Sequence, residues 1–93
     1  MAEDNTILIG VKPFMNYVTA VVMQFTTKNA NEVIIKARGK FISRAVDVAE
    51  VTAKRFLENS VEPKDIKISS EEFKNKDGKQ IRVSGIEILL VKK

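Results

Sequence analysis

The stretch Lys36-Ala-Arg-Gly-Lys-Phe-Ile-Ser-Arg44 places four cations and no anion in nine residues, between a strand-like run and a helix-like run. The whole chain has a formal net charge of +4, so the remaining residues sum to zero. Backbone N–H groups at the start of a helix favour phosphate, and Gly39 lets the backbone come close to a ligand. We therefore expect the ligand to be a polyanion, and nucleic acid first.

Regular elements are predicted on both sides of this stretch. The β-branched run Glu32–Arg38 predicts a strand bounded by Gly39. After it, one apolar stripe at helical spacing predicts a helix: Ile42, Ala45, Val46, Ala49, Ala53, Phe56 and Leu57. Asn59-Ser60 and Pro63 mark the end of that helix. Within it, the spacing of Glu50 and Lys54 suits a weak ion pair.

The N-terminal third predicts a strand and a helix. Thr6–Gly10 is a short apolar run closed by glycine and indicates a buried strand. Pro13 suits the first position of a helix, where its missing N–H has no cost. Apolar residues then recur at steps of three and four, which predicts a helix from about Pro13 to Thr27: Phe14, Val18, Val21, Val22 and Phe25.

The last third changes to a period of two. Lys64–Ser69 alternates as a half-exposed strand does, and Lys74–Lys79 is a polar hairpin loop that contains Asp77-Gly78. A final strand is predicted from about Gln80 to Val91. Its apolar residues change parity at Ser84-Gly85, which predicts a β-bulge there.

The predicted order is β-α-β-α-β-β, an α/β (α+β sandwich) fold in one domain that spans residues 1–93. We expect a mixed four-stranded sheet, two helices on one face, a long hairpin between the last two strands, and disorder in residues 1–5. A right-handed first crossover would make the first two strands parallel.

Composition argues against an enzyme. Cysteine and histidine are absent, which removes thiol chemistry, the commonest general base and the commonest metal ligand. Glu71-Glu72 is an adjacent acid pair, and on a strand its members point to opposite faces. We find no catalytic constellation and expect no cofactor or metal. No apolar run is long enough for a membrane span, so we expect a soluble intracellular domain.

The candidate binding residues are cations. Lys36 and Arg38 share a strand face, while Lys40 and Arg44 lie at the start of the second helix. Lys12 joins them if the loops after the two parallel strands emerge at one end of the sheet. The hairpin supplies a second cationic group: Lys74, Lys76, Lys79 and Arg82. From charge alone, a solvated basic surface without a partner remains an alternative.

Three segments carry a family resemblance: Ile-Leu-Ile-Gly-Val-Lys-Pro-Phe-Met-Asn-Tyr (7–17), Ile-Ile-Lys-Ala-Arg-Gly-Lys-Phe-Ile-Ser-Arg-Ala-Val-Asp (34–47) and Val-Ser-Gly-Ile-Glu-Ile (83–88). The chain resembles the Alba family of small archaeal chromatin proteins over nearly its whole length. The resemblance implies a homodimer that binds double-stranded DNA and RNA. The body of the dimer would lie on the sugar-phosphate backbone of the duplex, and the two hairpins would reach along its minor groove.

Carried over by position, the resemblance implies nucleic-acid contacts at Lys12, Lys36, Arg38, Lys40 and Arg44, with Asn16 and Tyr17 near that surface. It also implies a contact between neighbouring dimers at Phe56, although an aromatic residue on this stripe could equally be core.

One position departs from the family pattern. The family has Gly-Lys-Lys-Pro, whose first lysine is acetylated, and this chain has Val11 there. Two charges are then missing from each dimer. If each contributed one phosphate contact, the slope of log affinity against log salt would fall by about two, at roughly 0.9 per neutralised phosphate.

The leading hypothesis is a non-enzymatic chromatin-type protein, cytoplasmic and associated with the chromosome, that condenses DNA with little sequence specificity. The alternative is an RNA-binding or ribonucleoprotein component, or a weaker DNA-binding regulator with little chromatin-coating role. Which nucleic acid dominates stays open at this point.

Overall fold

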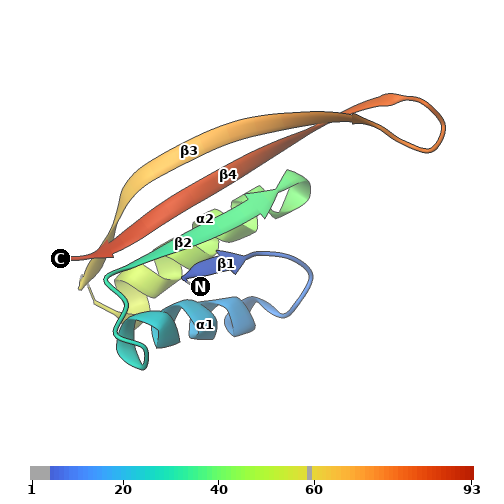
Figure 1. Cartoon of the computed structure of the whole chain (residues 1–93). Coiled ribbons are helices and arrows are strands. Elements are labelled where there is room, and N and C mark those ends of the chain that lie inside the picture. Colours follow the sequence, from blue (N-terminus) through green and yellow to red (C-terminus); the bar gives the residue numbers. More distant parts are fainter. Residues whose placement is uncertain (1–4, 59) are drawn as a thin grey trace.

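The strand Glu32–Arg38 (β2) lies inside the sheet, as its alternation of apolar residues predicts. Val33, Ile35 and Ala37 are buried, while Glu32 and Arg38 at its ends are exposed. The computed structural model describes residues 5–58 and 60–93, with the elements shown in Figure 1. The other elements are β1 (Thr6–Leu8), α1 (Phe14–Thr26), the 3-10 turn η1 (Gly39–Phe41), α2 (Ile42–Val51), the π-helical turn η2 (Thr52–Phe56), β3 (Val61–Lys74) and β4 (Gln80–Lys92).

The sheet is mixed, with strand order β1-β2-β4-β3. β1 pairs parallel with β2, as predicted, and β4 pairs antiparallel with both β2 and β3. α1 and α2 cover one face, and the core lies between them and the centre of the sheet. The predicted α+β fold, with two helices on one face of a four-stranded sheet, is confirmed.

The face that α2 turns to the core differs in part from the predicted stripe. Ala45 and Ala49 are buried as expected, but Val48 is buried and Val46 is exposed. Apolar residues occupy more than one side of this helix, so periodicity could not choose the side that packs on β2 and β4. The helix then widens into η2, where the Leu57 N–H donates to the Thr52 carbonyl over 2.9 Å. That wider turn carries Phe56 off the stripe, and half of its surface is exposed. The predicted end marker Asn59 lies outside the described residues.

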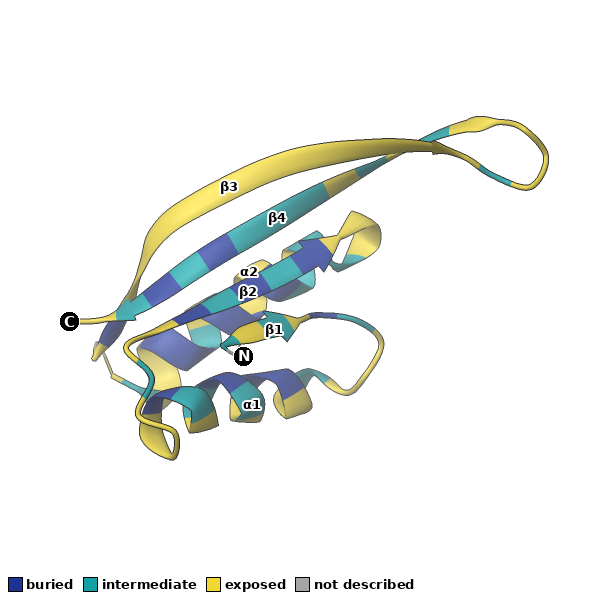
Figure 2. Cartoon of the chain, in the orientation of Figure 1, coloured by how far each residue is buried: buried dark blue, intermediate teal, exposed yellow. Residues whose placement is uncertain are grey.

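β3 is exposed on both faces beyond Val61, so the prediction of a half-exposed strand was wrong (Figure 2). Ile66 and Ile68 pair with Ile88 and Ile86 of β4 and therefore share the face that the helices cover elsewhere. The helices stop short of this edge, and Ile68 remains 82% exposed. Alternation revealed the strand but could not show how far the helices extend.

The predicted bulge at Ser84-Gly85 was also wrong. The register runs without interruption through Ser70–Ser84 and Ser69–Gly85. The apolar residues change from odd to even positions because β4 leaves the core at this point, not because the strand bends. The one register shift between described strands lies in β3 between Pro63 and Asp65, beside a proline that has no N–H to donate.

β1 is shorter and less buried than predicted. It covers Thr6–Leu8 at the sheet edge, and Leu8 is exposed, while Ile9, just after the strand, is buried. Pro13 immediately precedes α1 instead of being its first residue. Of residues 1–5, expected to be disordered, 1–4 lie outside the described residues. The Asn5 carbonyl accepts a hydrogen bond from the Ile34 N–H over 2.9 Å.

Candidate nucleic-acid interface

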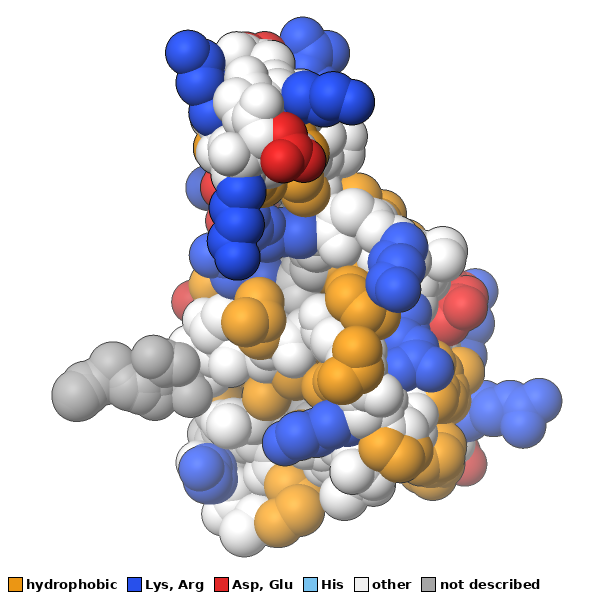
Figure 3. Space-filling model, turned by 90° about the vertical axis from the view of Figure 1, so that its right-hand side faces the viewer, with side chains coloured by type: hydrophobic (Ala, Val, Ile, Leu, Met, Phe, Trp, Pro, Cys, Tyr) orange, Lys and Arg blue, Asp and Glu red, His pale blue; other side chains and the backbone are white. Residues whose placement is uncertain are grey.

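The loops after the two parallel strands meet at one end of the sheet, and the β3–β4 hairpin projects past the same end (Figure 1). The molecule is elongated as a result, with extents of 46 × 25 × 21 Å. Gly39, with φ of +58°, lets the chain turn directly from β2 into η1. Seen from this end, Lys and Arg side chains surround the hairpin tip and continue over the body below it (Figure 3).

The loop Gly10–Lys12 is fixed by the hydroxyl of Tyr17. This hydroxyl accepts hydrogen bonds from the N–H groups of Gly10, over 2.9 Å, and of Lys12, over 3.0 Å. The two lone pairs of a hydroxyl oxygen allow both bonds at once. Tyr17 is itself buried, so the loop is tied to the core through α1.

Arg44 fixes the same loop from the side of α2. Its Nη1 donates to the carbonyl of Lys12 over 2.7 Å and to the carbonyl of Gly10 over 3.2 Å. The sequence predicted Arg44 as a phosphate contact. In the structure one of its nitrogens is engaged with the loop, so it also positions Lys12.

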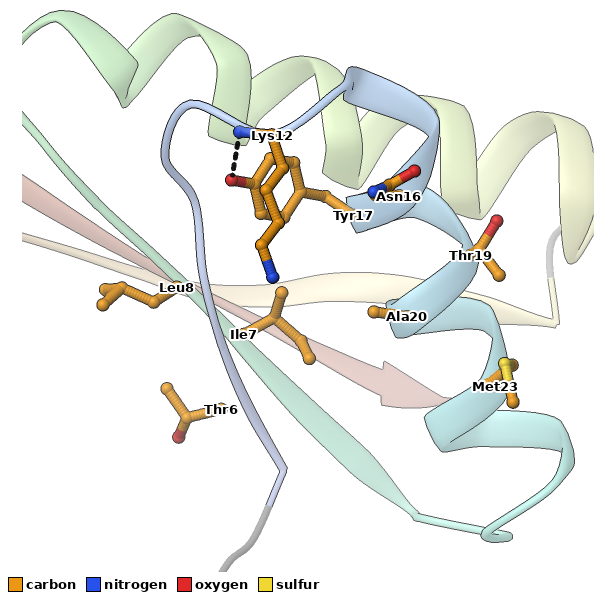
Figure 4. A pocket seen from close by; sticks show the side chains of 9 residues that line it. All are labelled: Thr6, Ile7, Leu8, Lys12, Asn16, Tyr17, Thr19, Ala20 and Met23. Atoms are coloured by element: carbon orange, nitrogen blue, oxygen red, sulfur yellow. Dashed lines mark hydrogen bonds between the residues drawn. The ribbon is translucent and has the colours of Figure 1, made fainter.

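Lys12 extends from this fixed loop over a groove between β1 and α1, which Asn16 and Tyr17 also line (Figure 4). The groove has a volume of about 560 Å³ and is open to solvent. A second open hollow, of about 540 Å³, separates the loop from the start of α2 and is lined by Val11, Lys40 and Arg44 among others. Val11 stands at the tip of the loop, 85% exposed. Lys40 and Arg44 line this second hollow together, whereas Lys12 lines the groove between β1 and α1. That the three contact one ligand stays a prediction.

Lys36 and Arg38 lie on the other face of the sheet, the one without helices, because they alternate with the buried residues of β2. Both are paired with acids. Lys36 Nζ is 3.6 Å from Glu87 Oε2, and Arg38 Nη2 is 3.2 Å from Glu71 Oε1. Arg38 ends β2 next to η1, and Lys40 places its Nζ 5.5 Å from the centre of the Phe41 ring. The sheet face without helices therefore meets the hollow lined by Lys40 at the turn from Arg38 to Lys40.

The hairpin loop Asn75–Lys79 is ordered by one side chain. Asn75 Oδ1 accepts hydrogen bonds from the N–H groups of Asp77 and Lys79, over 2.9 and 3.0 Å. Lys74, Lys76 and Lys79 have no ion-pair partner in the part of the chain that the structure describes. Arg82 behind them is paired with Glu72 at 3.3 Å. The tip therefore offers free cations on a defined turn.

Sequence reasoning did not predict that three acids pair with candidate contact residues: Glu71, Glu72 and Glu87. Strand alternation gives the face of each acid, but its partner depends on strand order and register, which no local pattern fixes. The bonds of Tyr17 and Arg44 to the loop were missed for the same reason. Among residues 5–58 and 60–93, no group of three or more acidic, His or Cys side chains could hold a metal ion, and no helix has the length and apolarity to cross a membrane.

Comparison with known proteins identifies the family and its fold. The model of the Alba family matches residues 5–70. This chain belongs to the Alba family. It is 57% identical to the DNA/RNA-binding protein Alba 1 of Archaeoglobus fulgidus over 93 residues, with 100% of each chain covered. It is 53% identical to the DNA/RNA-binding protein Alba of Methanococcus maripaludis over 89 residues, covering 96% of this chain and 99% of the relative.

A solved Alba structure has the same fold. The Alba of Thermoplasma volcanium superposes with a TM-score of 0.85 at 49% identity, covering 95% of this chain and 100% of that one. The family resemblance seen in the three sequence segments is therefore confirmed.

Proposed function

We propose that this Alba protein binds double-stranded DNA and RNA as a homodimer, through contacts to the sugar-phosphate backbone and with little sequence preference. It would organise the chromosome within the cytoplasm and catalyse no reaction. The relatives named DNA/RNA-binding protein Alba support the class of ligand.

One observation carries the proposal: free cations of the body loop and of the hairpin tip lie at the same end of an elongated molecule. Lys12, Lys40 and the hairpin lysines could contact phosphates spread along a duplex, with Arg38 between them. Contacts of this kind fix position on the duplex but read no sequence. Asn16, Lys36 and Arg82 would extend the footprint.

Homodimerisation is supported by the exposed apolar side of β3. Ile66 and Ile68 lie uncovered on one face of this edge strand. Bare apolar edge strands invite pairing with another chain, and a second copy would cover them. A dimer would also double the number of phosphate contacts. Phe56, half exposed on η2, is available for a contact between neighbouring dimers.

The test is binding to random duplex DNA, duplex RNA and single strands across a salt series, with Arg38→Ala as the variant. We expect a steep salt dependence on duplex DNA, and uniformly weaker binding across sequences in the variant. Its salt slope should fall by roughly 0.9 for each phosphate that the variant no longer neutralises. A changed sequence preference with unchanged overall affinity would contradict backbone binding through Arg38.

A role mainly on RNA is the second candidate, and the exposed Val11 favours it. An apolar residue at the loop tip removes a phosphate contact, while a wide, shallow RNA minor groove can still be followed by shape and by 2′-hydroxyl contacts. Clearly tighter binding to RNA than to DNA in the same series would support this role. Val11→Lys should then restore DNA binding, with a steeper salt slope.

A further inference from the structure

The bridge between Arg38 and Glu71 joins two strands that are not neighbours. Arg38 ends β2 and Glu71 belongs to β3, and β4 runs between them. In the sheet register Arg38 lies opposite Gly85, which lies opposite Ser69. These residues share the face without helices, and Glu71 follows on that face two residues after Ser69. The Arg38 side chain must therefore cross β4 to reach its partner.

Gly85 leaves that crossing open. A Cβ added at Gly85 would lie 3.7 Å from Arg38 Cγ and 3.0 Å from Ser69 Oγ. A larger side chain at this position would occupy the space through which the arginine passes. The other ion pairs among the described residues join neighbouring strands or one helix: Lys36–Glu87, Arg82–Glu72 and Lys54–Glu50.

We propose that Glu71 occupies the anion site of Arg38 in the free protein and that a backbone phosphate displaces it on binding. This inference rests on the proposed function and adds to it a residue that sets affinity. Carboxylate and phosphate oxygens offer a guanidinium the same kind of acceptor, so the two groups compete for the donors of Arg38. The two side chains are 56% and 59% exposed, so a phosphate can reach the bridge and replace the carboxylate.

A simpler effect must be separated from this one. The charge of Glu71 could oppose binding by repelling phosphates at a distance, without any link to Arg38. Repulsion between Glu71 and phosphate would act equally whether or not Arg38 is present. Competition between them for Arg38 would vanish when Arg38 is removed. A double-mutant cycle between the two positions therefore distinguishes them.

The experiment measures binding of random duplex DNA at one fixed low salt concentration. The proteins are the unsubstituted chain, Glu71→Gln, Arg38→Ala, the double variant, and Glu50→Gln as control. Glu50 of α2 is an exposed acid paired at 3.0 Å with Lys54 of η2, so its variant loses the same charge and the same kind of ion pair. Thermal unfolding checks that all five proteins fold.

We expect Glu71→Gln to bind about two- to fivefold tighter, the range that an exposed ion pair allows. The same substitution in the Arg38→Ala background, and Glu50→Gln alone, should leave affinity unchanged. Equal tightening with and without Arg38, or no tightening in Glu71→Gln, would overturn the inference while the proposed function stands. Absence of duplex binding by the unsubstituted protein at this salt concentration would overturn both.

Discussion

At the scale of single residues, the loop Gly10–Lys12 depends on two side chains from two helices. Tyr17 accepts its N–H groups and Arg44 donates to its carbonyls. A loop held in this way loses little further freedom when Lys12 meets a ligand, which favours binding.

Replacing Tyr17 by Phe removes the acceptor and leaves the N–H groups of Gly10 and Lys12 without it. We expect the free energy of unfolding to fall by about 1–3 kcal/mol, as when other part-buried polar groups are deprived of their partner. Urea unfolding followed by circular dichroism measures this decrease. A variant as stable as the parent would show that water satisfies the loop equally well.

At Thr52, by contrast, we expect a substitution to stabilise the protein. Its hydroxyl is fully buried and has no hydrogen-bond partner within the described chain. Thr52→Val replaces that hydroxyl by a methyl group of similar size, so we expect the free energy of unfolding to rise by about 1 kcal/mol. The same urea titration tests it, and a decrease would mean that the hydroxyl has a partner after all.

At the scale of elements, sequence reasoning located β2 correctly and placed α1 to within a residue at each end, because local periodicity and Gly39 determine those bounds. It could not determine what depends on partners. The exposure of Ile68, the burial of Val48 and the continuous register at Gly85 all follow from which elements lie next to one another. Likewise, it named candidate cations but did not predict which of them pair with acids.

Gly85 tests how closely the strands of the sheet pack. It lies opposite Arg38 of β2 on one side and opposite Ser69 of β3 on the other. We expect Gly85→Ala to destabilise the sheet by about 1–3 kcal/mol, since its Cβ would lie only 3.0 Å from Ser69 Oγ. Ser69→Ala in the same chain should recover most of this stability. Equal stability of Gly85→Ala and the parent in thermal unfolding would contradict the crowding.

At the scale of the whole molecule, the two edges of the sheet differ. β1 is short and lies beside α1, whereas β3 is long and presents bare isoleucines. Among residues 5–58 and 60–93, only the β3 edge offers a second copy an extended apolar strip of this kind.

Placing a charge on that strip tests the assembly. We expect Ile68→Lys to shift the protein from dimer to monomer in sedimentation equilibrium and to weaken duplex binding, because each monomer then binds alone. Met23→Lys, on α1 by the opposite edge of the sheet, adds the same charge and should leave the dimer intact. An unchanged dimer in Ile68→Lys would exclude β3 from the interface.

The hairpin beyond Gly85 has a consequence for motion. From Ser70 to Lys74, β3 pairs only with β4 residues that have no β2 partner, so two strands stand there without a helix behind them. A lone two-stranded ribbon in water is barely stable, and it opens without the rest of the fold. Backbone amides at the tip should therefore exchange with deuterium orders of magnitude faster than those of Val33 and Ile35. On the proposed function, this flexible hairpin on a rigid body would adjust to the local groove width of the duplex that it contacts.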